Sequence, residues 1–178
     1  MGHKYTTLIP DEENSGKLVV GPIDFIAKPE ILDSMDINSI VCCTNGMDDE
    51  SMDIIMRKIE NENNFLMYKL DDMITNDFVS LINGDKYNLD YVTSWIHNKL
   101  IANQNILVYC DGGVTRSVSV CISYIMRYGL KPSSQNLMTF DDAVYHMYSI
   151  RECSDISLFR EELITWEKIC RKELSSNN

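Results

Sequence analysis

Two patterns of apolar residues alternate along the chain. In longer stretches, such as residues 88–102, apolar side chains recur every three or four positions and mark one face of a helix. Shorter continuous apolar runs between turn residues are typical of buried strands. These patterns predict strands at residues 18–20, 40–43, 65–70 and 106–109, and helices at residues 49–61, 88–102, 115–128, 139–150 and around 158–169.

The order of these predicted elements indicates an α/β fold. Strands that alternate with helices form a mainly parallel central sheet flanked by helices on both faces. We expect a single domain at residues 17–174, between a flexible N-terminal segment at residues 1–16 and a disordered tail at residues 175–178. The run at residues 18–20 is expected to be an edge strand, because a Gly-Pro pair stops it at once.

Composition and charge narrow the range of functions. The chain has 178 residues and a net charge of −11, from 27 acidic and 16 basic residues. Nucleic-acid binding draws its affinity from clustered basic side chains, so neither DNA nor RNA is an expected partner. No apolar run is long enough to span a bilayer, and the polar N-terminal stretch lacks the apolar segment of a signal peptide. The sequence therefore predicts a cytoplasmic protein.

The six cysteines show neither a CxxC pair nor the Cys/His spacing of a zinc site. In a cytoplasmic protein they are expected to be reduced thiols. Five of them are interpreted as small core residues, and no metal or other cofactor is expected.

The N-terminus carries a pattern for lipid attachment. Gly2 begins a segment that fits N-myristoylation once Met1 is removed. One acyl chain gives only weak, reversible membrane binding, and an unmodified N-terminus is the alternative. Any membrane association is therefore expected to be partial, without insertion into the bilayer.

The segment after the strand at residues 106–109 is the candidate site. Cys110 is followed by Gly113 three positions on, Arg116 six on and Ser117 seven on, where a helix is predicted to begin. A short loop that opens a helix directs several main-chain N–H groups inward and forms an anion site. In an α/β sheet such a loop lies beyond the carboxyl ends of the strands, where ligands bind. The residues expected to surround a phosphate are Asp111, Gly112, Gly113, Val114, Thr115 and Arg116.

Cys110 is the expected nucleophile of this site. A free thiol is only slightly ionised at neutral pH, whereas a helix N-terminus and Arg116 favour the thiolate. The thiolate would attack phosphorus to form a phosphocysteine intermediate. Arg116 can hold two phosphate oxygens through its planar guanidinium, and Ser117 can hydrogen-bond the sulfur and help it leave. The alternative is a buried cysteine beside a salt-bridged arginine.

This loop resembles the signature loop of the cysteine-based protein tyrosine phosphatases, and the short chain resembles their dual-specificity branch. The resemblance extends from about Leu18 to Trp166. It implies a general acid from a loop before the signature strand, for which Asp72 is the matching residue and Asp71 and Asp77 are the alternatives.

The resemblance also implies a substrate class. Arg151 matches a position that can contact a second phosphate or an acidic substrate residue, although a surface salt bridge is equally compatible with it. No stretch resembles the loop that deepens the pocket of the classical tyrosine phosphatases. The expected substrates are therefore phosphorylated proteins, with phosphoserine and phosphothreonine hydrolysed as well as phosphotyrosine, and no metal is needed.

Departures from the family pattern leave two alternatives open. Tyr109 stands where the family usually has His, and Asp111 places a negative charge beside the nucleophile. The family's Pro-Asn pair before the last helix is replaced by Asp155 and Ile156. These changes motivate the first alternative, a catalytically weak module that binds phosphorylated proteins. A phosphoinositide or RNA 5′-phosphatase is the other alternative, which the lack of basic residues between Cys110 and Arg116 disfavours.

Overall fold

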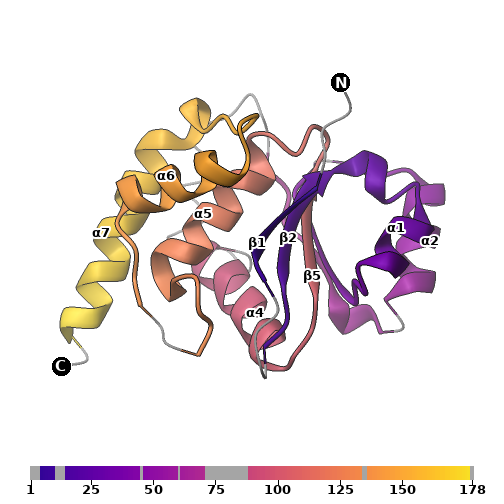
Figure 1. Cartoon of the computed structure of the whole chain (residues 1–178), viewed down its shortest axis with the longest axis horizontal. Helices are drawn as coiled ribbons and strands as arrows, with labels where there is room; N and C mark the ends of the chain where they lie inside the picture. Colours follow the sequence, from indigo (N-terminus) through magenta and orange to yellow (C-terminus); the bar gives the residue numbers. More distant parts are fainter. Residues whose placement is uncertain are drawn as a thin grey trace.

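A five-stranded sheet lies between two layers of helices in the part of the chain that the computed structural model describes, residues 5–10, 15–44, 46–59, 61–70, 88–133 and 136–176 (Figure 1). The strands are β1 (Thr6–Ile9), β2 (Leu18–Pro22), β3 (Ser39–Cys42), β4 (Phe65–Met67) and β5 (Ile106–Cys110). The helices are α1 (Pro29–Ser34), α2 (Asp49–Lys58), α4 (Leu89–Ile101), α5 (Arg116–Tyr128), α6 (Phe140–Ile150) and α7 (Arg160–Ser176). Short 3₁₀ turns occur at Ile23–Phe25, Glu62–Asn64 and Ser157–Phe159.

The strand order is β1-β2-β5-β3-β4, with β1 antiparallel to β2 and the other neighbouring pairs parallel. This arrangement confirms the predicted α/β fold with a mainly parallel sheet. The predicted edge position of β2 is wrong, because β1 and β5 pair with it on its two sides. A Gly-Pro pair is tolerated there because it falls at the end of the strand.

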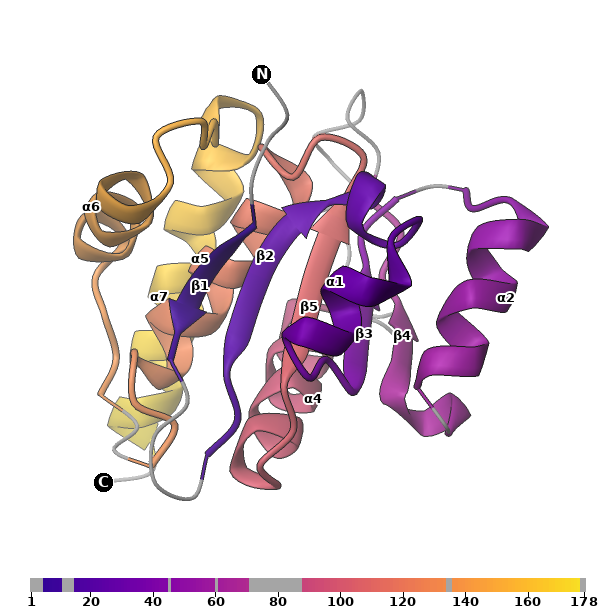
Figure 2. The same cartoon turned by 45° about the vertical axis from the view of Figure 1, so that its right-hand side comes forward.

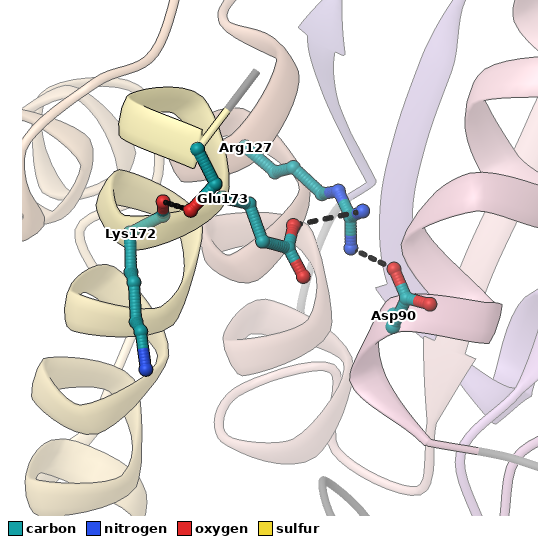
Figure 3. Close-up of a pocket in the computed structure, with 5 residues that line it drawn as sticks. Asp90, Arg127, Lys172 and Glu173 are labelled. Atoms are coloured by element: carbon teal, nitrogen blue, oxygen red, sulfur yellow. Dashed lines mark hydrogen bonds and ion pairs between the residues drawn. The ribbon is translucent and has the colours of Figure 1, made fainter. Parts of the chain in front are cut away.

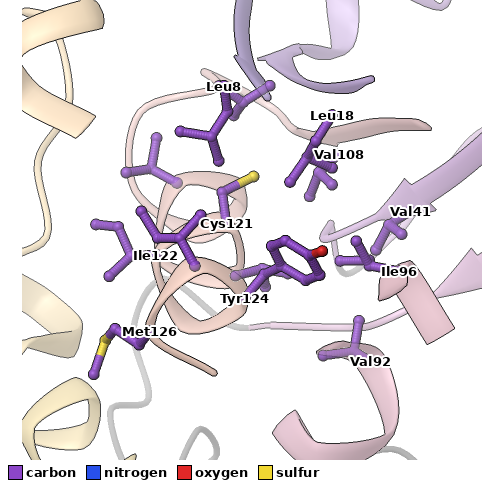
Figure 4. Packing of buried hydrophobic residues seen from close by; sticks show 14 of the residues in the cluster. Leu8, Leu18, Val41, Val92, Ile96, Val108, Cys121, Ile122, Tyr124 and Met126 are labelled. Carbon is purple, nitrogen blue, oxygen red and sulfur yellow. The ribbon is translucent and has the colours of Figure 1, made fainter. Parts of the chain in front are cut away.

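Successive residues of each inner strand face opposite layers of helices. Val108 of β5 packs into the larger core beneath α4 and α5, whereas its neighbour Tyr109 packs into the smaller core beneath α1 and α2. Figure 4 shows the larger core, where Tyr124 and Cys121 of α5 lie among strand residues. Complete burial of one such valine side chain contributes roughly 1.5–3 kcal/mol. The sheet is therefore held in place from both faces.

Helix α5 is the central helix of the larger layer, with α4, α6 and α7 packed around it (Figures 1 and 2). Its residues 116–126 are all buried. Trp166 of α7 donates a hydrogen bond from Nε1 to the carbonyl oxygen of Ser123, with 3.0 Å between the two atoms. These contacts hold α5 against its neighbours, and the predicted phosphate loop ends at its N-terminus.

Two of the helix ends have local capping contacts. Thr139 accepts a hydrogen bond from the main-chain N–H of Asp142 at the start of α6. Gly129 ends α5 with φ of 78°, a conformation that glycine adopts most readily.

Both ends of the domain differ from the prediction. Thr6–Ile9, within the segment predicted to be flexible, form β1, and Leu8 and Ile9 are buried. At the other end, α7 extends to Ser176, two residues into the predicted disordered tail. Each short segment gains order by packing or pairing with a larger element, which local sequence does not reveal. Gly2 lies outside the described residues, and no described helix is long and apolar enough to cross a membrane.

Candidate active site

The loop at residues 111–115 joins β5 to α5 at the carboxyl end of the sheet (Figure 2). The parallel register aligns Pro22 of β2 with Cys110 of β5. Strand β3 lies on the other side of β5, and the N–H group of Cys43 donates to the carbonyl oxygen of Tyr109 at 2.8 Å. The loop thus begins between two strands and ends at a buried helix, the location that the sequence predicted.

Gly113 is the residue that lets the loop turn tightly. Its φ is 63°, and a Cβ atom there would lie 2.5 Å from the main-chain carbon of Gly21 and 2.6 Å from the nitrogen of Pro22. The loop therefore rests directly on the backbone of β2, at a position where only glycine fits. Gly112 is different, because a Cβ atom there would meet only the side chain of Val114, at 3.6 Å.

The sulfur of Cys110 lies at a small hollow formed by the loop. The hollow has a volume of about 110 Å³ and is lined by Cys110, Gly112, Val114, Thr115 and Arg116. The Sγ atom of Cys110 is 3.2 Å from the Oγ atom of Ser117, within hydrogen-bond distance. Cys110 is 2% exposed and Ser117 is fully buried. A thiol and a hydroxyl group therefore meet at the N-terminus of α5, beside the hollow, where main-chain N–H groups favour an anion.

The guanidinium of Arg116 is directed towards the loop. Its side chain is 6% exposed, and one terminal nitrogen lies 2.6 Å from the Oδ2 atom of Asp111. The other terminal nitrogen is 3.4 Å from the carbonyl oxygen of Leu70. The side chain of Asp111 is 60% exposed and does not line the hollow. The sequence predicted a main-chain role for Asp111; its carboxylate also forms an ion pair with the predicted phosphate-binding arginine.

Arg151 lies behind the loop, where it is 4% exposed. Its Nε atom donates to the carbonyl oxygen of Gly113 at 3.0 Å, and a terminal nitrogen donates to the Oγ1 atom of Thr6 at 3.0 Å. The sequence predicted that Arg151 contacts substrate; in the structure its guanidinium is buried and contacts the loop from the protein interior. Thr6 was not singled out from the sequence, and no local signal there indicates the contact.

The main chain of Asp155 gives a second support. Its N–H group donates to the carbonyl oxygen of Val114 at 3.1 Å. Asp155 stands in the segment where the family has a Pro-Asn pair, so a main-chain contact is present where a supporting side chain was expected to be lost.

Tyr109, in place of the family's usual His, points away from the nucleophile. Its hydroxyl donates to the Sδ atom of Met47 at 3.0 Å, and its ring packs in the smaller core. Burial, reinforced by the neighbouring thiols, raises the pKa of Tyr109. The hydroxyl therefore stays protonated and neutral near the site.

Cys43 and Cys121 lie in the same core as Cys110. Burial raises the pKa of Cys43, with a further increase from the nearby Cys110 thiol, and burial also raises the pKa of Cys121. Both thiols therefore remain protonated at neutral pH and are poor nucleophiles. Cys110, by contrast, lines the hollow, and it is the cysteine among the lining residues.

The candidate general acids are outside the described residues. Asp72 and its alternatives, Asp71 and Asp77, all fall in the gap between residues 70 and 88. The described chain before this gap ends at Leu70, whose carbonyl oxygen is the one near Arg116. Among the described residues, no cluster of His, Cys, Asp and Glu has the composition of a metal site.

A larger hollow of about 330 Å³ lies near the C-terminus of α5 (Figure 3). There Arg127 forms ion pairs with Asp90 of α4 and with Glu173 of α7, the latter at 3.2 Å. These ion pairs connect three helices across the hollow, and we interpret the cluster as a structural link between them.

Comparison with known proteins identifies the family. The profile of the dual specificity phosphatase catalytic domain matches residues 25–169. The chain therefore belongs to this family of cysteine-based phosphatases, and the resemblance predicted from the loop is confirmed. No protein of the curated set matches the chain.

Solved structures of similar fold are phosphatases or phosphatase-like proteins. The PTP-2 phosphatase of Cydia pomonella has 21% identity and a TM-score of 0.61, with 91% of this chain and 88% of that chain covered. The human tyrosine phosphatase-like serine/threonine/tyrosine-interacting protein has 20% identity and a TM-score of 0.65, with coverages of 93% and 96%. PTPMT1 in complex with PI(5)P has 13% identity and a TM-score of 0.66, with coverages of 96% and 98%. At these identities the similarity establishes the fold.

Proposed function

We propose that the chain hydrolyses phosphate monoesters on proteins, with phosphotyrosine, phosphoserine and phosphothreonine as substrates. The observation that carries this proposal is the hollow at the loop, which is lined by both Cys110 and Arg116. Its volume of about 110 Å³ suits a phosphate group and its ester oxygen. Because no stretch of the sequence resembles the loop that deepens the pocket of the classical tyrosine phosphatases, we expect a site shallow enough for a phosphate on a short serine side chain as well as on a tyrosine.

The reaction proceeds in two displacements. The Cys110 thiolate attacks phosphorus, the P–O ester bond breaks, and Asp72 donates a proton to the leaving oxygen. Asp72 then takes a proton from water, which attacks the phosphocysteine and releases inorganic phosphate and the thiolate. Arg116 and the main-chain N–H groups of the loop neutralise the charge on the equatorial oxygens. The hydroxyl of Ser117, 3.2 Å from the sulfur, stabilises the thiolate as it leaves.

A set of three variants tests this mechanism with an aryl phosphate. Cys110→Ser should abolish turnover, and Asp72→Ala should reduce kcat by roughly 10²- to 10⁴-fold. Cys153→Ser is the matched control, because Cys153 is a partly exposed cysteine outside the loop. Measurable turnover by Cys110→Ser, or normal kcat in Asp72→Ala, would contradict the assigned roles.

The ion pair between Asp111 and Arg116 supports a second candidate function, a weak phosphatase that mainly binds phosphorylated proteins. A carboxylate 2.6 Å from the guanidinium competes with the phosphate for the same donors. Asp111→Asn removes this charge and preserves a similar shape. If the Asp111 carboxylate weakens phosphate binding by Arg116, this variant should have a lower KM for aryl phosphate than the wild type. If the chain is a binding module, the wild type should retain a phosphopeptide while turnover stays at background.

A substrate panel separates protein from lipid substrates. PTPMT1 has been crystallised with PI(5)P, so phosphoinositides belong in the panel. The loop between Cys110 and Arg116 contains no basic residue to meet additional phosphates, which favours phosphoproteins. Faster hydrolysis of phosphoinositides than of phosphopeptides would overturn this choice of substrate.

A further inference from the structure

Arg151 connects three parts of the molecule that are distant in sequence. It follows the C-terminus of α6, and its guanidinium is buried between the phosphate loop and β1. One nitrogen donates to Gly113 of the loop and another to Thr6 of β1, each at 3.0 Å. A buried cation requires such partners, because burial without hydrogen bonds is strongly unfavourable. Both hydrogen bonds therefore stabilise the buried guanidinium.

The bond to Gly113 determines which way a loop peptide faces. In a trans peptide the carbonyl oxygen and the following N–H group point in opposite directions. Arg151 holds the carbonyl of Gly113 from the interior, so the N–H of Val114 points to the other side of the loop. Val114 is one of the residues that line the hollow. In the same way, Asp155 holds the carbonyl of Val114 and orients the N–H of Thr115.

The bond to Thr6 adds the N-terminal strand to this arrangement. Thr6 pairs in register with Val20 of β2, and the next residue of β2, Gly21, is the backbone on which Gly113 rests. Strand β1 is thus joined to the loop by two routes, through β2 and through Arg151. The route through Arg151 depends on a single threonine hydroxyl.

We propose that Arg151 is a positioning residue for the phosphate loop, and that the docking of strand β1 tunes oxyanion binding through the Thr6–Arg151 hydrogen bond. Neither side chain contacts the substrate. When Thr6 releases Arg151, the guanidinium loses its contact with β1 and holds the Gly113 carbonyl less firmly. The N–H groups of the loop are then less well aligned for phosphate. The proposal rests on the proposed function, because it assumes that the hollow binds an oxyanion.

Thr6→Val tests the proposal with little risk to folding, since valine has nearly the shape of threonine and favours strands. Thr7→Val is the matched control, because Thr7 is the exposed neighbour on the same strand. Thr6→Ser retains a hydroxyl and should behave as the wild type. For each variant, binding of inorganic tungstate is measured by calorimetry, amide hydrogen exchange in residues 111–115 by mass spectrometry, and stability by thermal melting.

We expect Thr6→Val to bind tungstate about fivefold more weakly and to exchange its loop amides faster, with a small decrease in melting temperature because a buried donor of Arg151 loses its acceptor. Thr7→Val and Thr6→Ser should match the wild type in both measurements. Equal tungstate binding and equal loop exchange in Thr6→Val and Thr7→Val would overturn the proposal. If the wild type binds no tungstate, the proposed function fails, and the exchange of the loop amides alone then decides whether Arg151 positions the loop.

Discussion

Substitution of Gly113 by alanine is the sharpest test of how the loop is built. The structure leaves no room for a methyl group at this position, since the nearest main-chain atom of Gly21 would be only 2.5 Å away. The obstacle is backbone of the central sheet, which cannot rotate aside as a flexible side chain can. The φ of 63° adds a second penalty, because residues with a Cβ atom avoid this region.

The steric clash can be expressed as a loss of reaction rate, and the backbone strain as a loss of stability. Ordinary contact begins at 3.4 Å, so the loop and β2 must separate by about 1 Å. A misplacement of about 1 Å in an active site can reduce the rate by roughly 10²-fold. The backbone strain costs about 1–2 kcal/mol of unfolding free energy. For a domain of this size, this corresponds to a decrease of roughly 2–8 °C in melting temperature.

The assay compares Gly113→Ala with Gly112→Ala, whose new methyl group would be in ordinary contact, 3.6 Å from Val114. Melting temperature and kcat/KM for an aryl phosphate are measured for both. Gly112→Ala should keep the melting temperature of the wild type, whereas Gly113→Ala should lose both stability and activity. If Gly113→Ala retains kcat/KM within about threefold of the wild type, the loop does not rest on Gly21 as described.

Three further predictions concern stability. Burial, with a smaller effect of the Arg127 charge, lowers the pKa of His97 from its ordinary 6.5. Between the lowered pKa and 6.5 the unfolded chain therefore binds more protons than the folded one. The free energy of unfolding should fall as the pH drops from 6.5 to the lowered pKa of His97. His97→Phe should flatten this decline in melting temperature, and an unchanged slope would refute the assignment. Arg127→Gln breaks the ion pairs with Asp90 and Glu173, each worth about 0.2–1 kcal/mol. Its loss of stability should shrink at high salt, and the same loss at low and high salt would contradict an ionic origin. Trp166→Phe removes a buried hydrogen bond to α5 and should lower the free energy of unfolding, measured in urea, by about 1–3 kcal/mol. An unchanged free energy of unfolding would show that the indole N–H contributes nothing.

Much of the fold could be predicted from the sequence where local pattern and tertiary environment agree. The apolar run at residues 106–109 became the central strand β5, and the helix after the loop runs from Arg116 to Tyr128. Strand β1 was missed because four residues carry too little pattern, and the strand exists only through its pairing with β2. The short helix α1 was missed for a similar reason, since six residues form a stable helix only against a packed partner.

For the candidate site, too, some features could be predicted from the sequence and others could not. The spacing from Cys110 to Ser117 predicted the loop, its location and the meeting of Cys110 and Arg116 there, because loop and helix are contiguous in the chain. The Asp111–Arg116 ion pair was not predicted, since a carboxylate beside an anion site looks unfavourable until the side-chain directions are known. For Arg151, family resemblance indicated contact with substrate, whereas the structure buries its guanidinium against the loop.

The sequence by itself determined the alternation of strands and helices and the chemistry of one contiguous loop, because periodicity and motif spacing act between near neighbours. Only the tertiary structure decided that Thr6 meets Arg151 and that Gly113 rests on Gly21. Such contacts join residues far apart in the chain, and they form only when the packing of the whole sheet brings their elements together.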